Sequence, residues 1–274
     1  MVTDNSAMAE NALEPSAHIL IIAGVDPTGN AGIVQDIHTV TQFGLKACIA
    51  VSALTVQTQK TVTQLRYTEA DFLKQQIEAA FTVPAIAAIK IGMLGTAAQA
   101  QMLGKFLHSR AQKHVILDPV LKASCGDALV EKGFCEVLRQ ELLPHISLLT
   151  PNLLELSSLT QQPLASCAQA AQHQAQLLLD STKLGAVLIK GGHSLGEEKS
   201  TDYLITRKEI VCFKLPQINN VTLRGTGCQL ASAIACYLAK NFSLSESIRQ
   251  AKLYLQQKFI KKLYTEQQNL QRGD

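Results

Sequence analysis

The chain has 274 residues, of which 47% are hydrophobic and 17% charged, a composition that is typical of a globular protein and excludes a disordered one. The net charge of +3 is spread along the chain without a long basic run, so we expect no nucleic-acid partner. No apolar run approaches about 18 residues, so we also expect no membrane span.

Short apolar runs alternate with helical patterns along most of the chain. Residues 1–17 lack the basic start and apolar stretch of a signal peptide, and we predict that they form a tail that is either disordered or tag-like. The runs that resemble buried strands are residues 18–24, 46–54, 85–94, 114–120, 145–152 and 185–193. Continuous apolar strands separated by helices indicate an α/β fold whose central parallel sheet is covered on both faces.

The C-terminal third of the chain has a different pattern. Residues 202–207 and 209–215 resemble two strands joined by a short turn, which predicts a hairpin near a sheet edge. Helical spacing predicts the last two helices at residues 226–240 and about 244–264. No linker or repeat divides the chain, so we predict one domain over residues 18–265, followed by a C-terminal tail at 266–274.

Seven cysteines occur, an odd number, and no two are spaced as C-x-x-C. This pattern disfavours both a disulfide framework and a zinc site, and it favours a reducing cytoplasm. We expect most of these cysteines to be small buried side chains.

Polar or glycine signals follow several predicted strands, where open α/β sheets bind ligands. In "GVDPTGNAG" (24–32) the glycines permit close backbone approach to a ligand, or form a plain capped turn. In "LDPV" Asp118 can meet a metal ion or act as a turn residue, and in "KGGH" Lys190 can neutralise phosphate or begin an ordinary turn. In "TPNLLE" Asn152 and Glu155 are spaced either to hold magnesium or to form a helix capping box, which is the favoured interpretation of that motif alone.

The stretch "RGTGC" (224–228) directly precedes a helical pattern. Amide groups at a helix start are unpaired and carry partial positive charge, and the small residues Gly225, Thr226 and Gly227 leave them open to an anion. Cys228 in such a position is expected to have a lowered pKa and to accept a proton as a thiolate. The alternative is a close helix-packing contact with a buried cysteine.

Taken in order, these stretches resemble the ribokinase-like superfamily, and within it the hydroxymethylpyrimidine/phosphomethylpyrimidine kinases of thiamine biosynthesis. The resemblance covers about residues 18 to 260 and is carried by "AGVDPTGNAGI", "KIGML", "LDPV", "CGDAL", "LTPNLLEL", "VLIKGGH" and "GTGCQLASAIA". It implies a three-layer α/β/α fold, with ATP and Mg²⁺ as cofactors. It also implies phosphorylation of 4-amino-5-hydroxymethyl-2-methylpyrimidine and of its monophosphate, and a homodimer.

The resemblance also implies roles for individual residues. Gly225, Thr226 and Gly227 would form the anion hole, with Cys228 as the catalytic base. Asp118 and Glu155 would bind magnesium, and Lys190 and Asn152 would lie by the phosphates. Arg224 stands where the family usually has a histidine, and it would add a cation near the phosphates. The pyrimidine pocket would use Gly24, Ala31, Asp36, Gln57 and Met93.

Three other functions remain open at this point. Related enzymes with a cysteine in this position also accept vitamin B6 alcohols, so a pyridoxal or pyridoxine kinase is the main alternative. Asn30, His38 and Thr58 depart from the family's usual residues, which leaves room for a non-catalytic pyrimidine-binding protein. A ribokinase-like enzyme for some other alcohol is the third.

Overall fold

The computed structural model describes residues 17–58, 60–83, 85–123, 125–191, 199–218, 221 and 223–272. Apart from Ala17, the predicted N-terminal tail lies outside these residues.

The centre of the molecule is a nine-stranded sheet with the order β3-β2-β1-β4-β5-β6-β7-β8-β9. Six neighbouring strands are parallel: β2 (Lys46–Gln57), β1 (His18–Val25), β4 (Ile86–Ile91), β5 (Val115–Leu117), β6 (Leu148–Leu149) and β7 (Val187–Lys190). The antiparallel strands are β3 (Val62–Tyr67) at one edge and β8 (Lys199–Ile205) and β9 (Ile210–Pro216) at the other. The predicted parallel sheet and edge hairpin are therefore confirmed.

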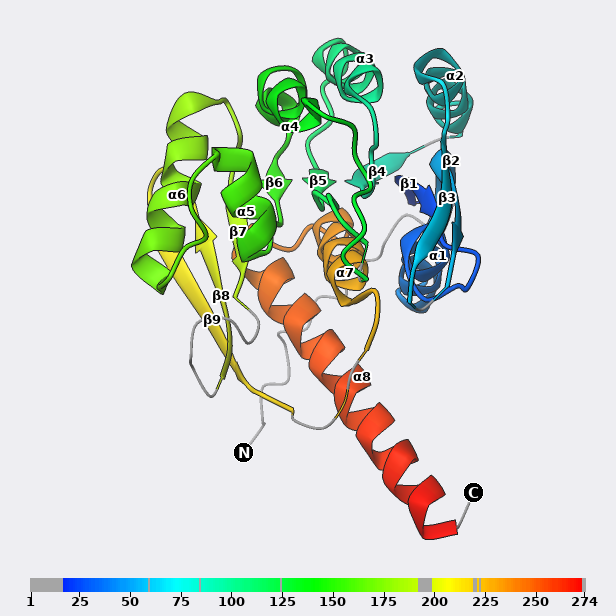
Figure 1. Cartoon of the computed structure of the whole chain (residues 1–274), viewed down its shortest axis with the longest axis vertical. Helices are drawn as coiled ribbons and strands as arrows, with labels where there is room; N and C mark the ends of the chain where they lie inside the picture. Colours follow the sequence, from blue (N-terminus) through cyan, green and yellow to red (C-terminus); the bar gives the residue numbers. More distant parts are fainter. Residues whose placement is uncertain are drawn as a thin grey trace, which may run out of the picture.

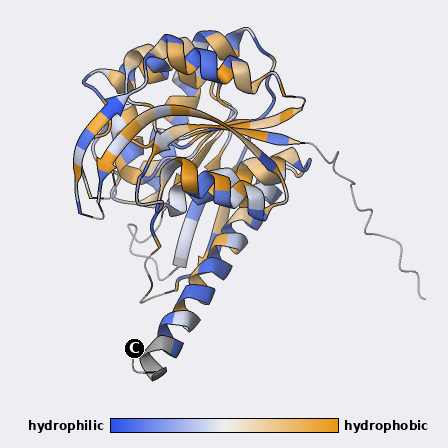
Figure 2. Ribbon diagram, turned by 90° about the vertical axis from the view of Figure 1, so that its right-hand side faces the viewer, coloured by the Kyte–Doolittle hydropathy of each residue, from blue (hydrophilic) through white to orange (hydrophobic). Residues whose placement is uncertain are grey.

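Helices cover both faces of this sheet (Figure 1). One face carries α1 (Gly32–Gln42), α7 (Thr226–Ala239) and α8 (Leu244–Arg272). The other carries α2 (Ala70–Ala80), α3 (Ala97–His108), α4 (Phe134–Val137), α5 (Leu153–Thr160) and α6 (Ala168–Ser181). Each face has its own apolar cluster, and Figure 2 shows the hydrophobic strands enclosed between the two helical layers. The predicted three-layer α/β/α architecture is confirmed.

The structure differs from the sequence prediction at three places. β5 and β6 have only three and two residues, because the chain turns away at the polar residues that follow each strand. The edge strand β3 was not predicted, since none of its six residues is fully buried and it lacks a continuous apolar run. The last helix does not end near residue 264 but continues to Arg272, through most of the predicted C-terminal tail, because Glu, Gln and Arg favour helix even without an apolar face.

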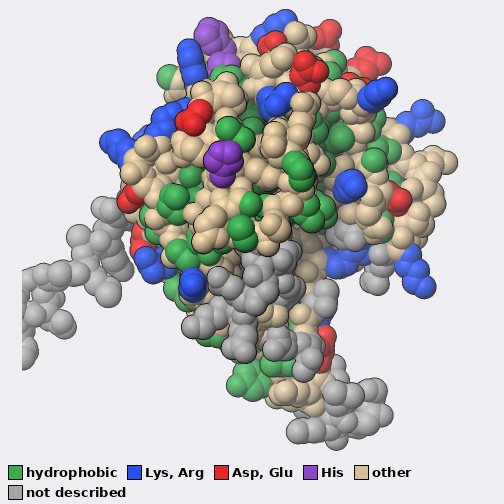
Figure 3. Space-filling view, turned by 60° about the vertical axis from the view of Figure 1, so that its left-hand side comes forward, with side chains coloured by type: hydrophobic (Ala, Val, Ile, Leu, Met, Phe, Trp, Pro, Cys, Tyr) green, Lys and Arg blue, Asp and Glu red, His purple; other side chains and the backbone are tan. Residues whose placement is uncertain are grey.

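In the described part of the chain, no helix is both long enough and apolar enough to cross a bilayer. Figure 3 shows basic and acidic side chains interspersed over one face of the molecule rather than gathered by sign.

The strand order places a topological switch point at β1. This strand pairs with β2 on one side and with β4 on the other. The connection that leaves β1 contains α1 on one face, whereas the connection that enters β4 contains α2 on the opposite face. Such a reversal opens a crevice beyond the carboxyl ends of the strands, where α/β proteins bind ligands.

Candidate active site

Most predicted site residues lie at this one edge of the sheet. Gly24 is near the end of β1, Gln57 ends β2 and Lys190 ends β7. Met93 follows β4 by two residues, and Asp118 directly follows β5. Parallel strands bring these positions, which are far apart in sequence, to the same side of the molecule.

The turn between β1 and α1 packs directly against the start of α7. A Cβ atom built on Gly225, which has a φ of +69°, would lie 2.5 Å from the carbonyl oxygen of Asn30 and 3.3 Å from Cα of Ala31. A Cβ on Gly24 would lie 3.0 Å from Sδ of Met93. Of the predicted pyrimidine-pocket residues, Ala31 therefore lies next to Gly225 of the predicted anion hole, and Gly24 lies next to Met93.

The first turn of α7 is open to a ligand. Gly225 is the N-cap residue, and no side chain caps the helix, so its first amide groups are left for other partners. Thr226 and Gly227 form the first helical residues and are partly exposed, as is Cys228. A helix start of this kind has the donors and the partial positive charge that an anion requires.

Two carboxylates share one lysine beside this turn. Nζ of Lys190 lies 2.6 Å from Oδ1 of Asp118 and 3.7 Å from Oε2 of Glu155. The hydroxyl group of Thr150, which follows β6, donates a further hydrogen bond of 3.2 Å to Asp118. A Cβ on Gly227 would lie 3.1 Å from Nζ of Lys190, so the helix start and this cluster are in contact.

Asn152 and Glu155 form the capping box that their spacing predicted. Oδ1 of Asn152 accepts a hydrogen bond of 2.8 Å from the amide of Glu155, and Oε2 of Glu155 accepts one of 2.7 Å from the amide of Asn152. The backbone of Asn152 also bridges to Lys190. The capping box therefore holds the Glu155 carboxylate beside Lys190, and the structural and the functional interpretations of this motif are compatible.

The charges in this cluster shift the pKa values of its members. Burial raises the pKa of Glu155 to about 7, although Lys190 lowers it. Burial also disfavours ionisation of Asp118, but Lys190 and Lys90 outweigh it and hold the pKa of Asp118 below its usual value. Near neutral pH the cluster therefore contains one fully ionised carboxylate and one that is close to its titration point.

Cys228 does not have the lowered pKa that its position suggested. Burial raises the pKa of this thiol to about 12, and the nearby carboxylates of Asp36 and Asp118 add to the rise. Lys90 and a hydrogen bond from the backbone amide of Gly32 act in the opposite direction. In the ligand-free protein the desolvation of the sulfur therefore outweighs the helix start, and the group is a protonated thiol.

Asp36 is placed differently from the expectation of direct contact with a pyrimidine. Its side chain is completely buried, and its Oδ2 lies 2.6 Å from Nζ of Lys90, which is equally buried. Oδ1 accepts a hydrogen bond of 2.8 Å from Ser232 on α7. Asp36 therefore lies behind the open part of the site, between α1, β4 and α7.

Sequence reasoning missed Lys90 and Thr150. Lysine is almost never fully buried unless it is paired, so a lysine inside the apolar run "AIAAIKIGML" was an available signal for a buried ion pair. Thr150 carries no such signal, because a threonine before proline is also common in plain turns.

The remaining predicted residues are less closely tied to the cluster. Gln57 is half-buried at the end of β2. Arg224 is also half-buried, and its carbonyl oxygen accepts a hydrogen bond of 3.4 Å from the side chain of Gln229. Gly192 and His193 of the "KGGH" stretch lie outside the described residues.

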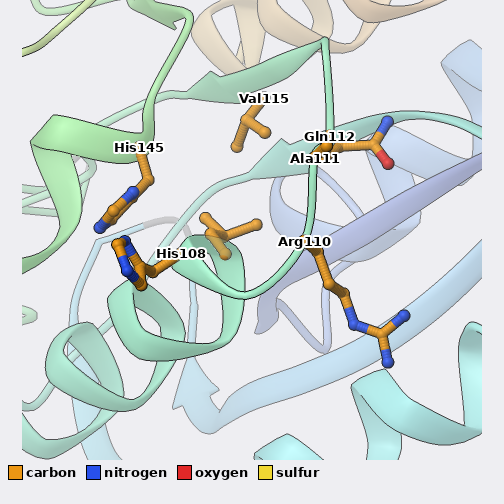
Figure 4. Close-up of a pocket in the computed structure, with 7 residues that line it drawn as sticks. His108, Arg110, Ala111, Gln112, Val115 and His145 are labelled. Carbon is orange, nitrogen blue, oxygen red and sulfur yellow. The ribbon is translucent and has the colours of Figure 1, made fainter.

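A separate cavity of about 270 Å³ lies elsewhere, where α3 ends and β5 begins. Figure 4 shows His108 and His145 facing each other across one side of it, while the Arg110 side chain points away from the pair. This cavity is at the amino end of β5, whereas Asp118 follows the carboxyl end. It contains none of the predicted site residues.

Comparison with known proteins identifies the family of the chain. The family model described as phosphomethylpyrimidine kinase matches residues 26–272. The chain belongs to this family. A hydroxymethylpyrimidine/phosphomethylpyrimidine kinase from Escherichia coli strain K12 is 36% identical over 236 residues, which cover 86% of this chain and 88% of that relative.

Solved structures of related kinases share the fold. The phosphomethylpyrimidine kinase of Clostridium difficile 630 superposes with a TM-score of 0.76 at 28% identity, over 88% of this chain and 99% of that one. The pyridoxal kinase of Staphylococcus aureus in complex with AMP-PCP gives a TM-score of 0.77 at 26% identity, over 86% of this chain and 85% of that one. The fold is therefore common to a phosphomethylpyrimidine kinase and a pyridoxal kinase.

Proposed function

We propose that this protein transfers the terminal phosphoryl group of ATP to the hydroxymethyl group of 4-amino-5-hydroxymethyl-2-methylpyrimidine, and then phosphorylates the resulting monophosphate, as a step of thiamine biosynthesis. The observation that carries the proposal is the position of the uncapped start of α7. Its residue Gly227 packs so closely against the Asp118–Lys190 pair that a larger side chain would crowd it. Phosphoryl transfer depends mainly on positioning and on neutralising charge, and these groups supply both.

The phosphate end of the site would use the donors that surround Gly227. The open amide groups of Gly225, Thr226 and Gly227 would bind the oxygens of the group in transfer. Lys190 would neutralise charge on the nucleotide phosphates, and Arg224 would add a second cation from the preceding turn. The similarity to a kinase that binds AMP-PCP supports ATP as the phosphoryl donor.

The donor set beside Lys190 fits a magnesium ion. Asp118 and Glu155 are carboxylates, the ligands that Mg²⁺ prefers, and a magnesium site commonly combines one or two carboxylates with phosphate and water. Bound there, Mg²⁺ would neutralise phosphate charge. Asn152 supports this pair by fixing Glu155 through the capping box.

The alcohol would bind in the pocket beside the β1–α1 turn. Gly24 and Ala31 would let a flat ring approach the backbone, and Met93 would pack against the ring. The amide of Gln57 would pair with a ring edge. Asp36 would not contact the pyrimidine, since it has no exposed surface.

Cys228 would take the proton of the substrate's hydroxyl group as the oxygen attacks phosphorus. The sulfur follows directly after the proposed anion hole, so the acceptor of the proton and the donors to the phosphoryl group belong to one helical turn. Because the free thiol has a pKa of about 12, the thiolate is a minor but strongly basic form.

We further propose that the protein works in the cytoplasm as a homodimer. The free state of all seven cysteines agrees with a reducing compartment. Sedimentation equilibrium of the full chain tests the dimer, and a purely monomeric protein at micromolar concentration would contradict it.

A coupled ADP-release assay across candidate alcohols, with products identified by mass, tests the proposed function. We expect turnover with the hydroxymethylpyrimidine and with its monophosphate, dependent on MgCl₂. Binding of the pyrimidine without any turnover would instead show a non-catalytic protein. The same assay tests pyridoxal, which the similarity to the S. aureus pyridoxal kinase keeps as the second candidate; a higher kcat/KM for pyridoxal would overturn the pyrimidine assignment.

A further inference from the structure

Lys90 is a buried charge that the proposed reaction does not yet use. It lies one residue before the end of β4, and its side chain and that of Asp36 on α1 have no exposed surface. Nζ of Lys90 and Oδ2 of Asp36 are 2.6 Å apart, and Ser232 of α7 donates to the other carboxylate oxygen at 2.8 Å. Groups from both helices therefore fix the ammonium in one position.

Through Asp36, this position is linked to Ser232 in the N-terminal half of α7. Ser232 follows Cys228 by four residues, so the two side chains occupy the same side of the helix. The ammonium lies 2.8 Å from the point that a Cβ on Gly92 would occupy, at the carboxyl end of the sheet. The Lys90 charge also interacts electrostatically with the Cys228 sulfur.

A contribution to folding stability does not by itself explain why Lys90 and Asp36 form a buried ion pair. Removing two charges from water costs several kcal/mol per ion, and apolar residues of similar volume often replace a buried ion pair without loss. The strand around Lys90 is otherwise apolar, with Ile89 and Ile91 fully buried. A buried cation does, however, interact strongly with a nearby negative charge, because little water screens it.

We propose that Lys90 is a positioning residue that acts through Cys228: a fixed cation, oriented by Asp36, that stabilises negative charge on the sulfur. This inference rests on the proposed role of Cys228 as the base. The thiol first loses its proton to solvent. In the transfer step an S–H bond forms as the hydroxyl O–H bond breaks, the oxygen bonds to phosphorus, and the bond from phosphorus to the ADP oxygen breaks. Lys90 keeps its proton throughout.

Among the described residues, four charged groups interact electrostatically with Cys228 from the elements around it. Lys90 on β4 and Lys190 on β7 favour the thiolate, whereas Asp36 on α1 and Asp118 after β5 oppose it. Lys190 and Asp118 are engaged with each other at 2.6 Å and belong to the proposed phosphate end of the site. Lys90 is paired as well, with Asp36 at 2.6 Å, but it has no place in the proposed phosphate end of the site, so its charge is left to act on the sulfur.

The test measures the reactivity of Cys228 in the ligand-free full chain, so it does not depend on turnover. Iodoacetamide reacts with the thiolate, and peptide mass spectrometry follows each cysteine separately, with exposed Cys167 and Cys212 as internal references. We expect Lys90→Met to slow alkylation of Cys228 about tenfold or more at a given pH, as a pKa rise of one unit or more would do. The rates at Cys167 and Cys212 should not change.

A second buried pair provides the matched control. Lys252 on α8 and Asp202 on β8 are also nearly buried and 2.5 Å apart, and Lys252→Met should leave the alkylation rate of Cys228 unchanged. Lys90→Met leaves the Asp36 carboxylate buried without a partner and could fail to fold for that reason. In that case the double variant Lys90→Met/Asp36→Asn removes both charges. It should also slow alkylation of Cys228, because the proposal requires the cation to outweigh the carboxylate at the sulfur.

Steady-state kinetics complete the test. Lys90→Met should lower kcat and shift its pH profile upward, with little change in KM. An alkylation rate of Cys228 that is unchanged in a folded variant without Lys90 would overturn the inference. Full turnover by Cys228→Ala would instead overturn the assignment of the base, so the two failures are distinguishable.

Discussion

Gly227 and Lys190 meet with almost no space between them: a methyl group on the glycine would lie 3.1 Å from the lysine ammonium and 3.4 Å from Oδ2 of Asp118. This contact joins the first turn of α7 to the end of β7. An anion bound at the helix start would therefore also lie beside a cation and a carboxylate suited to magnesium.

The substitution Gly227→Ala tests the anion hole, because it should affect the stability and the activity of the protein in opposite directions. Gly227 is helical and its φ is not in the left-handed region, so alanine should stabilise the helix by up to about 1 kcal/mol. The added methyl group would crowd Lys190 and cover the amide groups. We expect an unchanged or higher melting temperature together with a kcat/KM for ATP that is lower by about tenfold or more. Full activity in this variant would contradict an anion hole at Gly227.

A pair of glycine variants tests how the β1–α1 turn supports the site. Gly44 has a φ of +72° and open space around it, so Gly44→Ala should cost only the backbone strain of about 1 to 2 kcal/mol. Gly225→Ala adds an overlap with the Asn30 carbonyl oxygen, which is 2.5 Å from the new atom. We expect urea denaturation to show a larger loss of unfolding free energy for Gly225→Ala. Equal losses of unfolding free energy would indicate that the contact between Gly225 and the β1–α1 turn does not contribute to stability.

Cys228→Ala tests the base. Loss of a general base lowers turnover by about 100-fold or more, while binding of the alcohol is retained. Calorimetric titration of the pyrimidine provides the binding control. A variant that turns over as fast as the parent protein would remove Cys228 from the mechanism.

Glu155→Gln tests the magnesium site. Glutamine keeps the shape and the hydrogen bond to the Asn152 amide but loses the negative charge. We expect activity of the variant to require a higher MgCl₂ concentration, and the half-activating concentration measures this. If the requirement is the same, Glu155 serves only as a helix cap.

The pH dependence of stability tests the environment of Glu155 without any ligand. Its pKa in the folded protein is about 7, above the ordinary value of 4.5, so the folded state binds the proton more tightly than the unfolded state. The resulting stabilisation is present below about pH 4.5 and is lost as the pH rises through about 7. In magnesium-free buffer, Glu155→Gln should remove this part of the decline in melting temperature. A decline of the same size in both proteins would place the titrating group elsewhere.

The sequence predicted the fold well where one interaction dominates. Strands such as β1 and β4 are buried on both faces, so their apolar runs alone identify them. The Asn152–Glu155 capping box is local and could be read directly from its spacing. The positions of Gly24, Met93, Asp118 and Lys190 at one sheet edge followed from the parallel strand order.

Properties that depend on several distant elements could not be predicted in this way. The pKa of Cys228 is set by burial between helices and strands, and this outweighs the local effect of the helix start. The Lys90–Asp36 pair joins residues 54 apart in sequence. β3 becomes a strand because β2 offers it an edge, although its own residues show only a weak pattern.

The hydrogen bond from Ser232 to Asp36 spans 196 residues of chain. At a translation rate of about 5 to 20 residues per second, the partner of Asp36 leaves the ribosome roughly 10 to 40 s after Asp36 itself. Until then α7 has not been synthesised, so the Lys90–Asp36 pair and the apolar sheet face beneath α7 are left uncovered. A chaperone that shields this face during synthesis would therefore be expected to increase the yield of active protein.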